Sequence, residues 1–342
     1  MVTFKPKQVT KKLLSVLPDR ARDVLEKRYG LGDNAESRTL ESIGQMYGIT
    51  RERVRQIENY GIQSIQKSPE CNEFQPIFEE LQSIVRSLGS VVSEDDLLAE
   101  LAKDASTRNH IFFLLVLGSP FSRNKENALF RHRWYVEKKI ADTVEKALQR
   151  VFDSLAEDEL VPEKEIITRL QKELKDVEEQ YQDESILKRW LGLSKNIGRN
   201  PLGEWGPAQS PNVRAKGVRD YAYLVVKRHG SPMHFKEVAE AIEELFDRKA
   251  HVATTHNELI KDQRFVLVGR GLYALTEWGY SAGVVKDVLR DILQNHGPLT
   301  REEIIDRVRK ERYVKDNTII VNLQDTALFK QLPDGQYVVL ED

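Results

Sequence analysis

The chain holds a single cysteine, Cys71, among its 342 residues, so it cannot form an internal disulfide. It also lacks a long apolar run, and none reaches the roughly eighteen residues that a membrane helix needs. Lysines at the N-terminus precede only a short apolar stretch, which is not the pattern of a signal peptide. These absences predict a cytoplasmic protein that makes no membrane contact.

Patterns typical of enzymes are missing as well. The histidine pairs His229 with His234 and His251 with His256 are spaced out of register for two metal ligands on one helix face. Cys71 has no nearby histidine to activate it as a nucleophile. No glycine-rich loop opens a helix to cradle a phosphate. We therefore expect no enzymatic activity, no catalytic residue, no metal ligand and no cofactor.

What is present is an ordinary globular composition, 40% hydrophobic and 31% charged, with an uneven distribution of charge. Residues 1–70 carry thirteen Lys and Arg against nine Asp and Glu, a net charge of +4. Since the whole chain is at −2, the remainder carries −6. Neutralised phosphates supply most non-specific affinity for DNA, so the N-terminal part is the expected DNA-binding part.

The segment from Thr39 to Glu58, TLESIGQMYGITRERVRQIE, has the spacing of a DNA-binding helix-turn-helix. A first helix is expected from about Leu40 to Tyr47, with Leu40, Ile43 and Met46 on its inner face. Gly48 suits the tight turn that follows, and Thr50 is a good N-cap for the second helix. The two short helices therefore meet at a glycine turn.

The second helix of this pair is the expected recognition helix. Val54 and Ile57 point inward, which leaves a charged outer face free to enter a major groove. Arginine can bind guanine in a fork, glutamine can pair with adenine, and glutamate can accept from cytosine. The DNA-binding candidates are Thr50, Arg51, Glu52, Arg53, Arg55 and Gln56, joined by Lys11, Lys12 and Arg38 from outside the helix. The alternatives are a generic helix-turn-helix with a solvated basic face, or a degenerate domain kept for protein contacts.

Residues 13–67 resemble region 4 of the sigma-70 family of bacterial transcription initiation factors. The resemblance rests on LPDRARDVLEKRYGL from Leu17 to Leu31, on the segment above, and on a trailing helix through Ile62 and Ile65. It implies that the recognition helix reads the promoter minus-35 element, with Arg51, Glu52 and Gln56 on bases. It also implies docking on the beta flap of core RNA polymerase, so double-stranded DNA and the polymerase are the expected partners.

After Pro69 one capping pattern returns four times, at intervals of roughly 65 to 75 residues that suit a small domain. Each copy has a cap, an acid three residues later and then two apolar residues. The copies are Ser93-Asp96-Leu97-Leu98, Pro162-Glu165-Ile166-Ile167, His234-Glu237-Val238-Ala239 and Thr300-Glu303-Ile304-Ile305. Pro162 is expected in the first helical turn.

Each copy is followed by a predicted two-stranded ribbon, most clearly at 264–275 and 329–340. Three helices and a ribbon are the winged helix-turn-helix plan. The expected fold is mainly α with small β wings: a sigma region 4-like domain at 1–70, then winged units at 75–138, 139–210, 216–280 and 282–342. The third unit resembles the HARE-type winged helix of RNA polymerase delta subunits, on RDYAYLVVKRHGSPMHFKEVAEAI and FVLVGRGLYALTEWG.

The winged units are equally consistent with DNA contact and with protein docking, since the second helices of their helix-turn-helix pairs, such as Ala253 to Asp262 and Asn317 to Asp325, hold few Arg or Lys. Arg270, Arg131, His132 and Arg133 are their best candidates for a DNA contact. A sigma-70 factor, by the resemblance, melts the minus-10 element with an upstream domain, for which this chain leaves no room. We therefore expect a DNA-binding accessory or modulator of initiation; the alternative is a polymerase-docking decoy that reads no DNA.

Overall fold

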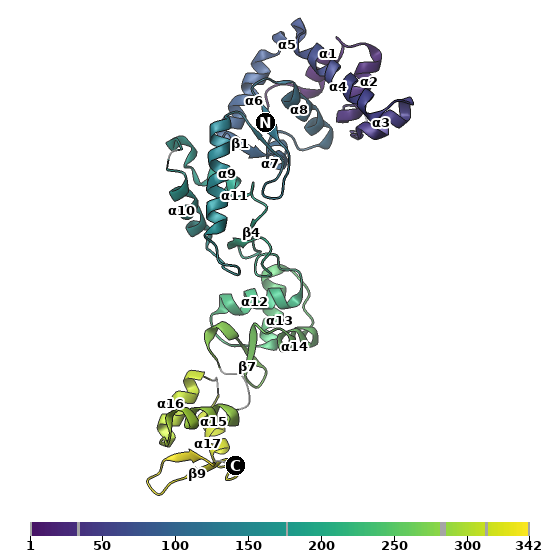
Figure 1. Ribbon diagram of the computed structural model, residues 1–342. Helices are drawn as coiled ribbons and strands as arrows, with labels where there is room; N and C mark the ends of the chain where they lie inside the picture. Colours follow the sequence, from purple (N-terminus) through teal and green to yellow (C-terminus); the bar gives the residue numbers. More distant parts are fainter. Residues whose placement is uncertain (1, 33–34, 176, 281–284, 312–313, 341–342) are drawn as a thin grey trace. The chain divides into compact units, whose positions relative to one another are not determined.

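The computed structural model describes residues 2–32, 35–175, 177–280, 285–311 and 314–340. Within these ranges the chain is mainly helical with small sheets, as the sequence predicts (Figure 1). Its contacts divide it into two units, Met1–Gly198 with Trp205–Gln209 and Arg199–Glu204 with Ser210–Asp342. Every helix in these ranges is too short or too polar to traverse a lipid bilayer.

The first unit begins with helices joined by short turns. They are α1 (Pro6–Leu14), α2 (Asp19–Tyr29), α3 (Leu40–Tyr47), α4 (Arg51–Gln66) and α5 (Pro69–Glu73). The prediction of a separate trailing helix through Ile62 and Ile65 is wrong, because α4 continues unbroken to Gln66. Gly61 lies within this helix, where a Cβ would lie 3.0 Å from Cδ1 of Leu25. Glycine thus lets α4 pack closely on α2, which offsets its poor helix propensity.

From residue 75 onward one order of elements recurs four times: a helix, a short extended segment, two helices and two strands. Repeat 1 (75–135) holds α6 (Gln75–Ser87), β1 (Val91–Ser93), α7 (Glu94–Leu101), α8 (Ala105–Leu117), β2 (Ser122–Asn124) and β3 (Arg133–Tyr135). Repeat 2 (138–207) holds α9 (Lys138–Asp153), α10 (Glu163–Glu173), η1 (Glu179–Tyr181), α11 (Glu184–Leu191), β4 (Ile197–Arg199) and β5 (Trp205–Pro207).

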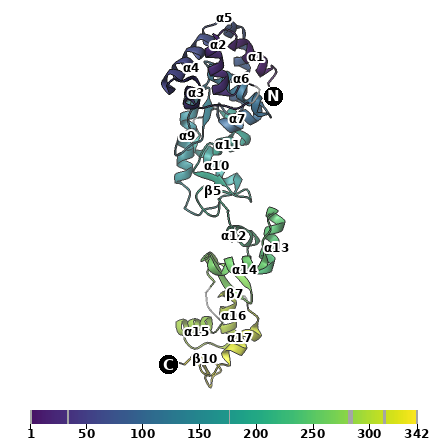
Figure 2. The ribbon, with the colours of Figure 1, turned by 90° about the vertical axis from the view of Figure 1, so that its right-hand side faces the viewer.

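The other two repeats keep this order (Figure 2). Repeat 3 (218–278) holds α12 (Val218–His229), β6 (Met233–His234), α13 (Phe235–Phe246), α14 (Val252–Lys261), β7 (Phe265–Gly269), β8 (Leu272–Leu275) and η2 (Thr276–Trp278). Repeat 4 (285–339) holds α15 (Val285–His296), α16 (Arg301–Glu311), α17 (Asp316–Leu323), β9 (Phe329–Gln331) and β10 (Tyr337–Val339). The predicted start of the fourth unit, at residue 282, lies outside the described residues.

The strand pairing is also common to the four repeats. The extended segment after the first helix pairs with the last strand, which pairs with the strand before it, giving the orders β1-β3-β2 and β6-β8-β7. In repeats 2 and 4 the extended segment is a single bridge, Val161 with Trp205 and Leu299 with Tyr337, beside the β4-β5 and β9-β10 pairs. The capping pattern in the sequence therefore marks segments with one element order and one strand order.

The caps themselves form largely as predicted. Ser93 Oγ accepts from the backbone N–H of Asp96, and Glu237 and Glu303 accept from the backbone N–H groups of His234 and Thr300 at 3.0 and 2.8 Å. Pro162 differs, since it stands just before the first turn of α10 and not within it. Its extended backbone, with φ −58° and ψ 148°, makes it the N-cap residue.

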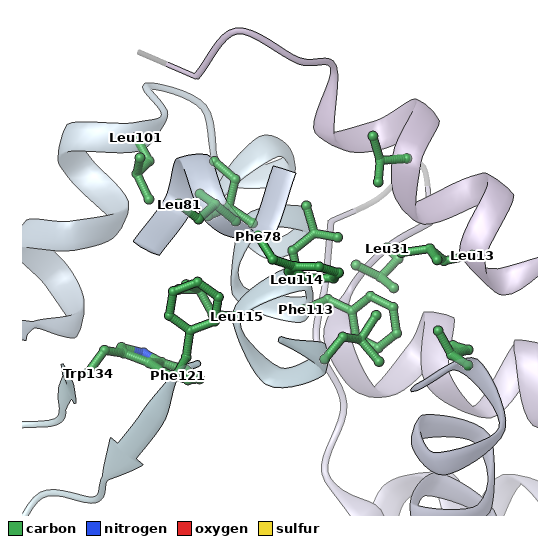
Figure 3. Close-up of a cluster of buried hydrophobic side chains, with 14 of the residues drawn as sticks. Leu13, Leu31, Phe78, Leu81, Leu101, Phe113, Leu114, Leu115, Phe121 and Trp134 are labelled. Carbon is green, nitrogen blue, oxygen red and sulfur yellow. The ribbon is translucent and has the colours of Figure 1, made fainter. Parts of the chain in front are cut away.

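One hydrophobic core joins the N-terminal helices to repeat 1. Residues 111–117 of α8, IFFLLVL, are apolar all round, and a helix of that kind must be covered on every side. In Figure 3, Phe113 and Leu114 of α8 lie between Leu13 and Leu31 on one side and Leu115, Phe121 and Trp134 on the other. The predicted boundary between 1–70 and 75–138 thus falls within a continuous core.

Further cores lie along the chain. A second cluster in the first unit joins Val91 and Phe130 of repeat 1 to repeat 2, with Trp190 fully buried. Trp190 Nε1 donates to the carbonyl of Val91 at 3.2 Å. In the second unit, repeat 4 has its own cluster around Leu289 and Ile304. The division into five domains remains a prediction.

A buried polar pair ties α1 to α8 within the first core. The hydroxyl of Thr10 lies 2.5 Å from Nδ1 of His110, and Thr10 and His110 are 0% and 6% exposed. Burial and the nearby charge of Lys7 lower the pKa of His110, while Asp104 opposes them weakly. His110 is therefore neutral in the folded protein near pH 7.

We expect this histidine to make the first unit sensitive to acid. Its folded-state pKa lies below the unfolded value of about 6.5, so its stabilising contribution is complete above that pH. It is lost as the pH falls from about 6.5 through the folded-state pKa, because the unfolded chain binds the proton more readily. Urea unfolding of wild type and His110→Asn from pH 7.5 to 5 tests this. The variant should lose less stability across that window, and parallel curves would contradict the expectation.

Candidate nucleic-acid interface

The helix pair α3–α4 forms as its sequence predicts. Thr39 and Thr50 cap the two helices, accepting from Ser42 and Arg53 N–H groups at 3.1 and 3.2 Å. Gly48 closes α3 with φ +64°, the left-handed conformation that favours glycine. Inside the pair, Ile43 and Val54 pack with Val24 of α2. The turn therefore holds α4 at a set angle to α3.

Two contacts near this turn were not predicted. A Cβ at Gly44 would lie 2.6 Å from the carbonyl oxygen of Ile49, so only glycine lets the turn pass so close to α3. Met46 was predicted on the inner face, but it is 49% exposed and its sulfur lies 2.9 Å from Nη1 of Arg38. The inner face is thus shorter than the three-residue pattern indicates.

The predicted recognition face of α4 is open to solvent. Arg51, Glu52, Arg53, Arg55 and Gln56 are all exposed. Arg55 binds Glu52 in a two-pronged ion pair, with Nε–Oε2 and Nη2–Oε1 distances of 2.8 and 2.7 Å. Arg53 Nη1 donates to Oε1 of Gln56 at 3.0 Å. Among the described residues, Arg51 finds no hydrogen-bonding partner.

These contacts set the charge of the face. The hydrogen bond from Arg55 lowers the pKa of Glu52, and Glu52 in turn raises the pKa of Arg55. Both groups therefore stay charged and offset one another. The uncompensated positive charge comes from Arg51 and Arg53, at the N-terminal end of α4. Exposed pairs of this kind contribute little to stability, so DNA can displace them at small cost.

The three candidates outside α4 lie in two places. Arg38 immediately precedes the cap of α3 and is exposed beside the helix pair. Lys11 and Lys12 lie on α1, which packs against α5 and α8. Lys11 is exposed, whereas Lys12 binds Glu73 at 2.6 Å and lies 5.3 Å from the ring centroid of Phe74. Arg38 is thus grouped with α4, and Lys12 already has an acidic partner.

Comparison with known proteins identifies part of this region. Residues 13–67 match the family model described as Sigma-70, region 4. RNA polymerase sigma factor SigA1 of Synechococcus elongatus is 59% identical over 46 residues, 14% of this chain and 11% of that protein. SigA of Listeria monocytogenes is 36% identical over 73 residues, 21% and 19%. SigA of a Nostoc species is 57% identical over 47 residues, 14% and 12%. This chain thus covers less than a fifth of the length of each relative.

The region 4 domain of residues 13–67 anchors α4 through a buried acid. Glu58 is 8% exposed and accepts from Tyr29 Oη at 2.9 Å and from Arg28 Nε at 3.3 Å. Burial, and then the Glu58 carboxylate, raise the pKa of Tyr29, so it remains a hydrogen-bond donor. Sequence reasoning missed this contact, because nothing in TRERVRQIE distinguishes Glu58 from an exposed acid.

The region 4 domain also has two cations that the sequence analysis left out. The Arg20 guanidinium and the Lys27 ammonium of α2 lie 5.7 and 5.9 Å from the ring centroid of Tyr47, at the end of α3. Both residues lie on the same face of α2, because they are seven residues apart. That spacing could have indicated from the sequence that the two cations lie together. Arg20 adds positive charge beside the helix pair, whereas the charge of Lys27 is offset by its ion pair with Asp23.

Outside the region 4 domain, the residues predicted to contact DNA differ in their exposure to solvent. Arg133 is wrong as a DNA contact: it is 2% exposed and its Nε lies 2.5 Å from Oε1 of Glu145. Arg131 is exposed, His132 is half-buried, and Arg270 is exposed at the turn between β7 and β8. In the described part of the chain no three His, Cys, Asp or Glu side chains are placed to hold a metal ion.

Proposed function

We propose that this protein acts in transcription, using its region 4 domain to bind a promoter element like the minus-35 sequence and to engage RNA polymerase. The observation that carries the proposal is the exposed face from Arg51 to Gln56, on a helix capped and angled by the Gly48 turn. It lies within the residues that match sigma-70 region 4, and the relatives that resemble this chain over 46 and 47 residues are RNA polymerase sigma factors.

In this proposal some side chains of α4 contact bases and others contact bases or phosphates. Arg51, Glu52 and Gln56 contact base edges, since guanidinium, carboxylate and amide groups match guanine, cytosine and adenine in the major groove. Arg53 and Arg55 contact base edges or phosphates, and Thr50 holds the start of the helix. Arg38 and Lys11 bind phosphates, which position the domain without carrying sequence information.

We further propose that repeats 1 to 4 are winged helix-turn-helix units, at 75–138, 139–210, 216–280 and 282–342. Support comes from their shared element order and strand order. Repeat 3 additionally resembles the HARE-type winged helix. In this view the repeats extend the region 4 domain, and the protein is accessory to initiation or modulates it. The polymerase contact is the beta flap.

The direct test is the wild-type protein with two duplexes of equal length, one bearing a minus-35-like element and one scrambled. Binding is measured by fluorescence anisotropy at fixed salt, because affinity for DNA depends steeply on ionic strength. The proposal requires tighter binding of the first duplex, together with retention of core polymerase on the immobilised protein. Equal binding of both duplexes would contradict sequence-specific reading.

A second candidate function is a polymerase-docking module that reads no DNA. The observation that favours it is the charge of −6 beyond residue 70, which opposes close approach of the rest of the chain to DNA. A variant with Arg51, Glu52 and Gln56 all changed to alanine separates the two. If the wild type and this variant both retain polymerase and neither binds a duplex, the docking module is supported.

Removing the Glu52 carboxylate is expected to raise the affinity for DNA, whereas removing an arginine of α4 is expected to lower it. Glu52→Ala removes an exposed negative charge and frees Arg55 from its ion pair. We expect affinity for scrambled duplex to rise a few-fold. The slope of log affinity against log salt should steepen by about 0.9, the value for one more neutralised phosphate. Glu79→Ala makes the same charge change at an exposed position of α6 and serves as the control. If the salt dependence of affinity has the same slope in the two variants, Arg55 does not contact a DNA phosphate.

A further inference from the structure

The third helix of repeat 1 is covered along its whole length. In a helix-turn-helix this helix is presented to the major groove. In α8 every residue after Ala105 is buried or half-buried, and its Arg108 donates to the carbonyl of Ala102 at 2.8 Å. The equivalent helix of repeat 3 differs, since α14 exposes residues such as Thr254, Asn257 and Lys261. Something other than DNA therefore occupies the surface of α8.

The occupant is the N-terminal helical region. Asn109 of α8 donates through Nδ2 to the carbonyl oxygens of Gly30 and Ala35, at 3.1 and 2.8 Å. Both acceptors belong to the loop that leads from α2 to α3. Gly30 has φ +64°, and a Cβ there would lie 2.6 Å from Nδ2 of Asn109. The loop that sets the start of α3 is thus fastened by a side chain from repeat 1.

A second contact leads from α8 to the recognition helix itself. The rings of Phe112 and Phe113 lie 6.1 and 5.0 Å from the ring of Tyr29, centroid to centroid. The Tyr29 hydroxyl then donates to the buried carboxylate of Glu58 on α4. An aromatic ring held by α8 therefore supplies a hydrogen bond to a buried carboxylate of α4.

Two more hydrogen bonds close the interface at its ends. His110 of α8 pairs with Thr10 of α1, as described above. Gln66, the last residue of α4, donates to the carbonyl oxygen of Leu117, the last residue of α8, at 3.0 Å. α8 thus contacts α1, the α2–α3 loop and both α2 and α4, which together determine where the exposed face of α4 points.

We propose that α8 of repeat 1 is the platform that positions the recognition helix of the region 4 domain, with Asn109 and Tyr29 as positioning residues. Repeat 1 consequently binds no DNA through its third helix. The inference rests on the proposed function for its consequence in DNA binding, but the anchoring of α3 and α4 can be measured without DNA.

The experiment uses the full-length chain with Asn109→Ala and Tyr29→Phe. Matched controls are Asn322→Ala, which removes a bond within α17, and Tyr221→Phe, which removes a hydroxyl that Arg248 contacts. Hydrogen exchange is followed at amides of α3 and α4, and duplex binding is measured with the minus-35-like and scrambled sequences. Exchange reports local opening, so it detects loss of anchoring in a protein that stays folded.

We expect exchange at α3 and α4 to accelerate at least tenfold in Asn109→Ala and Tyr29→Phe, and to stay unchanged in the controls. The ratio of affinities for the two duplexes should fall at least fivefold, while affinity for scrambled DNA and the thermal unfolding midpoint move little. A merely structural role would lower the midpoint and leave the ratio intact. Exchange equal to that of the controls would overturn the proposal. Faster exchange in a protein whose wild type prefers neither duplex would support the anchoring and contradict the proposed function.

Discussion

Replacing Arg51 with alanine is expected to remove most of the preference for a minus-35-like duplex. Arg51 is exposed at the start of α4 and has no hydrogen-bonding partner among the described residues, so its guanidinium is free to bind a guanine. A good two-pronged contact is worth about 1–3 kcal/mol of discrimination. Affinity for the preferred duplex should therefore fall about 5- to 150-fold, at tenfold per 1.4 kcal/mol. Affinity for scrambled duplex should fall far less.

Gln56→Ala should act in the same direction with a smaller effect. Its amide oxygen already accepts from Arg53 in the free protein, so binding adenine exchanges one hydrogen bond for another. Lys11→Ala is the control for charge alone, because Lys11 is exposed on α1 and should weaken both duplexes equally. Both measurements are anisotropy titrations at several salt concentrations. Equal losses on the two duplexes for Arg51→Ala would show that Arg51 contacts phosphate.

The helix pair was predictable because its determinants are local. Thr39, Gly48 and Thr50 act on backbone groups within four residues, and the structure places α3 at Leu40–Tyr47, as the pattern predicts. The four-fold recurrence was predictable for the same reason, since Ser93, His234 and Thr300 each pair with an acid three residues later and Pro162 stands at the matching position. A cap of this kind forms wherever the same residues recur at the same spacing.

The misplaced residues depend on partners far away in sequence. Met46 continues the apolar spacing of α3, yet it lies near the end of that helix, half exposed and in contact with Arg38. Arg133 reads as a wing cation, but Glu145 of the next helix buries it in an ion pair. Gly61 has a poor helix propensity, and only its contact with Leu25 shows why a glycine stands within the continuous helix α4. Periodicity indicates which faces are apolar, and it does not identify what covers them.

The fate of α8 illustrates this limit most fully. An apolar run such as IFFLLVL must be buried, but α8 is held by partners much earlier in the chain: Asn109 binds Ala35, 74 residues before it, and His110 binds Thr10, 100 residues before it. No spacing rule connects Asn109 to the loop after α2. A domain boundary drawn at a proline and a change of charge near residue 70 therefore crosses a core that the folded chain shares.

Phe113→Ala is the sharpest test of that shared core. Phe113 is 0% exposed, packs on Tyr29 and lies among side chains from both α1 and repeat 1 (Figure 3). Replacing a buried phenylalanine with alanine costs about 3–5 kcal/mol, because the transfer energy is lost and a cavity remains. We expect that loss to appear together in the helices before residue 67 and in repeat 1, as faster hydrogen exchange in α2, α4, α6 and α7.

Leu289→Ala is the matched control, since Leu289 is also 0% exposed but belongs to the cluster of repeat 4. It should lose a comparable 2–5 kcal/mol within its own cluster and leave exchange in α2 and α4 unchanged. Cooperative units exchange together, so the distribution of the effect identifies which segments share one folding unit. If Phe113→Ala accelerated exchange in repeat 1 alone, the N-terminal helices would be stable without it. The N-terminal helices and repeat 1 would then be in contact without stabilising one another, and α8 could not position α4.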